Sequence, residues 1–107
     1  MAKLEAKNAA QLLSAKWFAM NQRMELKAYV VQDRTVNVNG TEKIALDLFD
    51  GKNSYTLLLN ASNTKFLVEH GFNDSSELKG HELTITLDPN VRYKGKVVGG
   101  IRIINVK

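Results

Sequence analysis

The 107-residue chain contains no cysteine, one proline and two histidines. Without cysteine it can form neither disulfides nor thiolate metal sites and nucleophiles. No apolar run approaches the roughly 18 residues that a membrane-spanning helix needs. Residues 1–7 also lack the apolar core that follows the basic end of a signal peptide. We therefore expect one cytoplasmic domain without export, membrane insertion or disulfides.

Residues that commonly carry catalysis show no recognisable arrangement. His70 and His81 have no metal-ligand spacing, so we interpret them as a helix C-terminal cation and a surface residue. Gly95, Gly99 and Gly100 precede no predicted helix and lack the Gly-Lys-Ser/Thr ending of a phosphate-binding loop. We expect no enzyme activity, no bound metal and no cofactor.

Positive charge gathers near the end of the chain. The formal net charge is +4, but residues 89–107 alone carry +5, because they hold five Lys or Arg and no Asp or Glu. The preceding residues therefore sum to −1. A basic strip on a nearly neutral body favours an anionic partner, although a solvated charged hairpin has the same pattern.

Alternation with a period of two predicts five strands from Met24 onward. Asn39-Gly40 predicts a two-residue hairpin, since both positions must adopt positive φ. Turns are also predicted at 50–53 and 88–90. The inward-facing residues predicted for the five strands are Met24, Leu26, Ala28, Val30, Val36 and Val38; Ile44, Leu46 and Leu48; Tyr55, Leu57 and Leu59; Leu83, Ile85 and Leu87; and Ile101 and Ile103.

Two helical segments complete the prediction. Residues 3–20 are rich in helix formers, which predicts an N-terminal helical segment, 1–22, ahead of a barrel, 23–107. A second helix follows Asn60 or Ser62 and ends at Gly71. The resulting order is strand, strand, strand, helix, strand, strand. It predicts a mainly β protein, specifically the five-stranded β-barrel called the OB-fold; an SH3-like barrel and an open sheet stay open as alternatives.

Aromatic and basic residues indicate a binding surface. OB-folds hold oligonucleotides on strands two and three and the adjoining loops. A ring such as Tyr93 between cations can stack on a base, at about 1–3 kcal/mol, while the cations meet phosphates. The residues predicted to contact nucleic acid are Lys27, Tyr29, Arg34, Lys43, Phe49, Arg92, Tyr93, Lys94, Lys96 and Arg102.

The other aromatic residues have competing interpretations. Tyr55 alternates in phase with leucines, so we expect it in the core, whereas the phase of Tyr29 predicts exposure. Phe49 fits either a binding face or the end of the barrel. Trp17 is expected to pack the N-terminal segment onto the barrel.

The second half of the chain also carries a family resemblance. The segments are LLLNASNTKFLVEHG (57–71), FNDSSELKGHELTITL (72–87) and VRYKGKVVGGIRI (91–103). They resemble a family of small OB-fold-like proteins encoded by bacteriophages and prophages. The chain departs from that family in having Leu78-Lys79-Gly80 in place of Trp-Ile-Gly, and in its long N-terminal segment. The resemblance implies single-stranded DNA binding in phage replication or recombination, within the cytoplasm of a bacterial host.

Two hypotheses of different class follow. The first is a single-stranded DNA-binding protein with little sequence preference, with other replication or recombination proteins as further partners and no membrane. The second is a protein-interaction or assembly module that does not bind nucleic acid. In the second, the amphipathic segment 9–20 docks on a partner or pairs protomers in a homo-oligomer. Duplex DNA and RNA are further candidate ligands.

Overall fold

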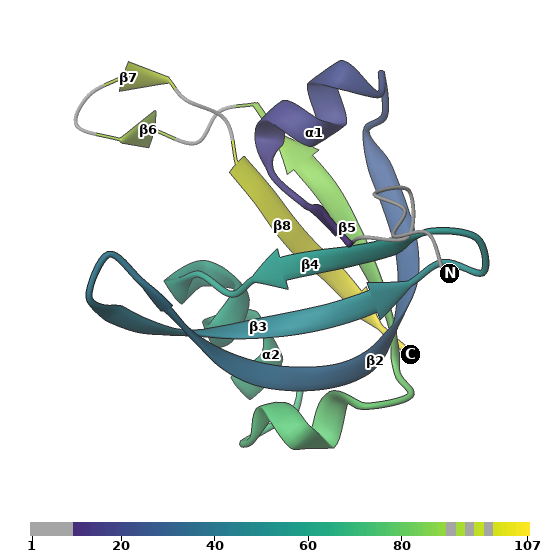
Figure 1. Cartoon of the computed structure of the whole chain (residues 1–107), viewed down its shortest axis with the longest axis vertical. Coiled ribbons are helices and arrows are strands. Elements are labelled where there is room, and N and C mark those ends of the chain that lie inside the picture. The colour runs from purple at the N-terminus through teal and green to yellow at the C-terminus, as the bar shows by residue number, and fades with distance from the viewer. Residues whose placement is uncertain (1–9, 90–91, 94–95, 98–99) are drawn as a thin grey trace, which may run out of the picture.

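The computed structural model describes residues 10–89, 92–93, 96–97 and 100–107. It is mainly β, as predicted, and its six principal strands form one strongly curled sheet in the order β1-β4-β3-β2-β5-β8 (Figure 1). Along the chain the elements are β1 (Gln11–Leu12), α1 (Ala15–Met20), β2 (Glu25–Val38), β3 (Thr41–Phe49), β4 (Ser54–Leu58), α2 (Ala61–Glu69), the 3-10 helix η2 (Ser75–Leu78), β5 (Glu82–Asp88), β6 (Arg92–Tyr93), β7 (Lys96–Val97) and β8 (Gly100–Val106).

The curl of the sheet follows from strand β2, which belongs to two pairings. Its first residues pair with β5, and its later residues pair with β3, both antiparallel. The register shifts between Val30 and Gln32, so that Val31 is an extra residue at the change of partner. Such a bulge bends a strand and increases its twist, and Figure 1 shows β2 sweeping round the molecule.

The bulge corrects one sequence prediction. Val36 and Val38 were predicted to continue the inner face of Leu26, Ala28 and Val30. In the structure Val36 lies opposite Lys43, on the outer face, and both valines are only partly buried. One inserted residue exchanges the two faces of every position beyond it.

The predicted turn between β2 and β3 is confirmed. Asn39 and Gly40 have φ angles of 52° and 81°, which are the values that a tight hairpin turn requires. The Asn37 side chain adds a hydrogen bond from the Gly40 amide at 2.9 Å. This turn sets the register of Arg34 opposite Ala45.

The core lies on the inner face of the curl and matches the predicted alternation at most positions. Tyr55 is 1% exposed, as predicted. Besides Val36 and Val38, the exceptions are Met24, which precedes β2, and Ile44, which is 37% exposed; Leu87 is only partly buried against the core. The remaining core residues are Leu13, Phe18, Leu26, Ala28, Val30, Leu46, Leu48, Leu57, Leu59, Leu67, Leu78, Leu83, Ile85, Ile101 and Ile103.

The N-terminal segment is part of this core. β1 pairs in parallel with β4, and Ser14 caps α1 by accepting a hydrogen bond from the Trp17 amide at 3.1 Å. Phe18 is fully buried, and Trp17 meets Tyr55 edge to face with ring centroids 5.3 Å apart. The packing role predicted for Trp17 is confirmed. The helix is shorter than the sequence predicted, because residues 11–12 form a strand; residues 1–9 lie outside the described part.

Helix α2 has the predicted limits, with Asn60 as its N-cap and Gly71 just beyond its end. Its Asn63 side chain is 1% exposed and completes the backbone pairing of β8. The amide nitrogen of Asn63 donates to the Ile101 carbonyl at 3.3 Å, and its oxygen accepts from the Ile103 amide at 3.0 Å. A side-chain amide thus takes the place of a neighbouring strand.

Among the described residues the curled sheet is open between β1 and β8, which are its two end strands. The architecture is therefore a half-barrel that is compatible with a barrel-like fold. No helix in the described ranges combines the length and apolar character needed to cross a bilayer.

Candidate nucleic-acid interface

Two aromatic side chains lie opposite one another on the outer face of the sheet. Tyr29 on β2 pairs with Phe49 on β3, and directly opposite residues have Cβ atoms about 4.5–5.5 Å apart. Tyr29 is 53% exposed and Phe49 is 41% exposed. The predicted exposure of Tyr29 is confirmed, and Phe49 takes the surface position rather than a buried one. Tyr29 and Phe49 are thus two neighbouring aromatic side chains that do not pack in the hydrophobic core.

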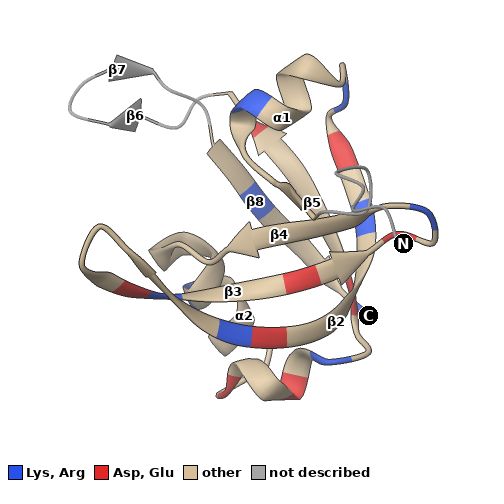
Figure 2. Ribbon diagram, in the orientation of Figure 1, with Lys and Arg blue, Asp and Glu red and all other residues tan. Residues whose placement is uncertain are grey.

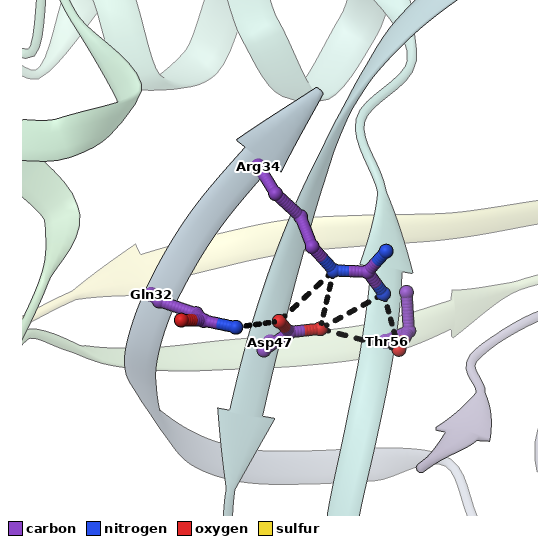
Figure 3. Close-up of polar contacts among 4 residues, drawn as sticks. All are labelled: Gln32, Arg34, Asp47 and Thr56. Carbon is purple, nitrogen blue, oxygen red and sulfur yellow. Dashed lines mark hydrogen bonds and ion pairs between the residues drawn. The ribbon is translucent and has the colours of Figure 1, made fainter. Parts of the chain in front are cut away.

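A polar network lies one step further along the same face (Figure 3). Asp47 on β3 is opposite Gln32 on β2 and Thr56 on β4. Its carboxylate accepts hydrogen bonds from Gln32 at 2.7 Å and from the Arg34 Nε and Nη2 atoms at 3.0 and 3.1 Å. Thr56 donates a weaker hydrogen bond at 3.4 Å. Donors from two strands therefore hold this carboxylate in one orientation.

The ionisation of Asp47 reflects these contacts. Burial raises the pKa of the carboxyl group, but hydrogen bonds from Arg34 and Gln32 and the positive charge of Arg34 outweigh that effect. The net result is a pKa below the usual value, and the same contacts raise the pKa of Arg34. The pair is therefore doubly ionised near neutral pH.

We expect this carboxylate to make the stability of the fold depend on acid pH. A group whose folded-state pKa is depressed contributes stability above its unfolded pKa of about 4, and that contribution is lost as pH falls through the folded pKa. The unfolding temperature should therefore fall as the pH drops below the ordinary aspartate pKa of about 4, and fall less in Asp47→Asn. Circular dichroism melts at several pH values measure this. Glu42→Gln, an exposed change on the same strand, should keep the wild-type pH profile; an identical profile for Asp47→Asn would count against the role.

The structure places the remaining predicted residues as follows. Lys27 is exposed on β2, two positions from Tyr29 and on the same face. Lys43 is exposed on β3 near the hairpin. Arg102 lies on β8, two strands from β2, and makes an ion pair with Asp88 at 3.7 Å. The face of β2 and β3 thus brings together Lys27, Tyr29, Phe49 and Arg34, with Lys43 at one end and Arg102 elsewhere.

The basic strip predicted from the sequence is only partly described. β6 and β7 pair with each other, with Arg92 opposite Val97 and Tyr93 opposite Lys96. Their side chains, and the whole of Lys94, lie outside the described residues. The predicted contacts of Arg92, Tyr93, Lys94 and Lys96 therefore stay predictions.

Sequence reasoning missed the partners of Arg34. Asp47 alternates in phase with Phe49, which was a usable signal for its face, but nothing local indicates that Arg34 would reach it. Charges of both signs occur along β2 and β3 rather than a purely basic surface (Figure 2). No group of three or more His, Asp or Glu that could hold a metal occurs in the described part of the chain.

Comparison of the chain with protein-family models, curated proteins and solved structures finds no match.

Proposed function

We propose that this protein binds single-stranded DNA with little sequence preference, on the outer face of β2, β3 and β4. The observation that carries the proposal is the cross-strand pair of Tyr29 and Phe49. Both rings are substantially exposed on a sheet face whose opposite side forms the core. Aromatic faces stack on any base, which provides affinity without selecting a sequence.

The strand arrangement supports an OB-type fold for this surface. β2 pairs with both β3 and β5, β3 pairs with β4, and β5 pairs with β8, with α2 between β4 and β5. An OB-fold is a partly open five-stranded Greek-key barrel that uses the face of its second and third strands for oligonucleotides. Those strands correspond to β3 and β4. In this view β1 is an addition that lengthens the sheet beside β4.

Positive charge beside the aromatic pair suits a polyanion. Lys27 is on the same face as Tyr29, where Glu82 of β5 lies opposite the tyrosine, and Lys52 is exposed in the turn that follows Phe49. The net charge of +4 and the basic strip at 92–96 add to this in the sequence. Neutralised phosphates release counterions, so binding should weaken as salt rises.

The structure removes the main observation that favoured the competing hypothesis of a protein-interaction or assembly module. That hypothesis was based on the amphipathic segment 9–20, but Leu13 and Phe18 of that segment are buried in their own chain. A role in phage replication or recombination, in the cytoplasm of a bacterial host, is supported by the family resemblance alone.

Fluorescence anisotropy with labelled oligo-dT tests the proposal. We expect binding at low salt, with log affinity falling linearly against log salt concentration. Tyr29→Ala and Phe49→Ala should each weaken binding about fivefold to a hundredfold, since stacking contributes about 1–3 kcal/mol per base.

Ile104→Ala is the matched control, because Ile104 is 51% exposed but lies on β8. It should leave the affinity unchanged. Unlabelled duplex DNA and RNA competitors distinguish the alternative nucleic-acid ligands. Absence of oligo-dT binding at low salt would refute the proposal.

A further inference from the structure

We propose that Arg34, oriented by Asp47, donates hydrogen bonds to the O6 and N7 atoms of one guanine base in the bound strand. This inference rests on the proposed function and deepens it, because it adds one base-reading position to a surface that otherwise binds by stacking.

The geometry of Arg34 leaves one edge of its guanidinium only weakly engaged. The Nε and Nη2 atoms donate to Asp47, so the side-on edge is occupied, and Nη2 also donates a long hydrogen bond to the Thr56 hydroxyl at 3.5 Å. The Nη1 atom points away from both Asp47 and Thr56 in Figure 3, and it forms no hydrogen bond with the residues that the structure describes. The arginine side chain is 45% exposed. On its end-on edge, Nη2 is engaged only by the long contact to Thr56. A ligand that replaces this 3.5 Å contact can accept two parallel hydrogen bonds, one from Nη1 and one from Nη2.

The negative charge of Asp47 determines which class of ligand the end-on edge of the Arg34 guanidinium can bind well. A free arginine would attract a phosphate through its charge. Here the carboxylate at 3.0 Å cancels most of that charge at a distance, while the directional N–H donors are retained. A neutral acceptor pair is the better match, and guanine O6 and N7 are the acceptors that arginine binds bidentately.

Asp47 and Gln32 also restrict the Arg34 side chain to one rotamer. The carboxylate is itself held by the Gln32 amide at 2.7 Å. An arginine that is already oriented loses less conformational entropy when it binds a planar base. Asp47 is thus a positioning residue, and Arg34 is the residue that would touch the base.

The location of Arg34 fits a strand whose neighbouring base lies on Phe49. Asp47 and Phe49 are two residues apart on β3 and share its outer face, which separates them by about 7 Å. The guanidinium of Arg34 reaches back to Asp47 from its own position opposite Ala45. When one base of the bound strand stacks on Phe49, the adjacent base, which has no aromatic ring to stack on, therefore lies near Arg34.

The test uses oligo-dT and three variants of it, in which the central thymine is replaced by guanine, adenine or 7-deazaguanine. We expect guanine to bind about fivefold to a hundredfold more tightly than thymine at that position. The 7-deazaguanine strand, which lacks N7, should lose most of this preference, and adenine should show none. Fluorescence anisotropy at one fixed salt concentration measures all four affinities.

Variants separate the two roles. Arg34→Lys should abolish the guanine preference, so that strands with guanine or thymine at the central position bind this variant with equal affinity. Asp47→Asn should also abolish it, but should steepen the salt dependence by about 0.7 in slope, since the released arginine can now meet a phosphate. Glu42→Gln removes an exposed carboxylate from the same strand and should change neither the preference nor the fold.

The outcomes are distinguishable. Binding of oligo-dT without a guanine preference, or a preference that survives in Arg34→Lys, would overturn the inference and leave the proposed function intact. Failure of folded wild-type protein to bind any strand would overturn both. Thermal unfolding curves of each variant establish that the affinities refer to folded protein.

Discussion

Replacing Asn63 with leucine is expected to lower the free energy of unfolding by about 2–5 kcal/mol, although the two side chains are similar in size. Asn63 is 1% exposed and forms two hydrogen bonds with the backbone of β8, one to the Ile101 carbonyl and one from the Ile103 amide. Leucine would leave both backbone groups buried without partners. Each orphaned group costs about 1–3 kcal/mol, and the gain in apolar burial offsets only part of that.

Urea or thermal unfolding measures this effect, and the expected loss corresponds to a fall of roughly 10–30 °C in Tm. Ser62→Ala, an exposed change in the same turn of α2, is the control and should alter stability by no more than about 0.5 kcal/mol. Asn63→Asp keeps the acceptor but loses the donor, so it should also destabilise strongly near neutral pH, where burial of a charge adds to the loss. A stable Asn63→Leu protein would mean that water or a strand neighbour replaces the amide.

Replacing Phe18 with alanine is expected to cost about 3–5 kcal/mol. Phe18 is fully buried, and its ring meets Trp17 edge to face at 5.1 Å between centroids. Deleting the ring removes apolar burial and leaves a cavity between the N-terminal segment and the sheet. The effect should therefore be as large as that of a core residue in the sheet itself.

Met20→Ala supplies the comparison, since Met20 is in the same helix but 72% exposed. We expect its effect to stay within about 0.5 kcal/mol. Equal stability of Phe18→Ala and Met20→Ala would mean that the segment is not part of the folded unit. The assembly hypothesis would then recover its motive, and light scattering would be the next measurement.

Local signals predicted much of the fold. The Asn39-Gly40 turn, the caps of α2 and the burial of Tyr55 all appear where the sequence indicates them. Each depends on a preference that operates over a few residues, such as positive φ or a side-chain cap. Hydrophobic alternation located the strands for the same reason, because one face of each strand must be apolar.

Contacts between distant residues were not predictable in this way. Asn63 reaches β8, about 40 positions along the chain, and Gln11 and Leu12 pair with β4. Ala45 is fully buried although it lies on the outer face, between Arg34 and Leu58. In each case the decisive neighbour comes from another element, so that no local pattern in the sequence reports it.

The candidate site shows the division most clearly. From the sequence alone, the phase of Tyr29 against an apolar face predicts that it points outward, whereas Phe49 fits either a binding face or the end of the barrel. The Asn39-Gly40 signal also predicted the tight hairpin. If β2 and β3 had continued from this turn in regular register, without a bulge, Phe49 would lie opposite Val30. The tertiary structure decided where β2 changes partners, and the resulting bulge at Val31 moved Tyr29 opposite Phe49. The physical reason is that a strand shared between two arms of a curled sheet must bend, and one extra residue allows the bend while both arms keep their apolar residues inside.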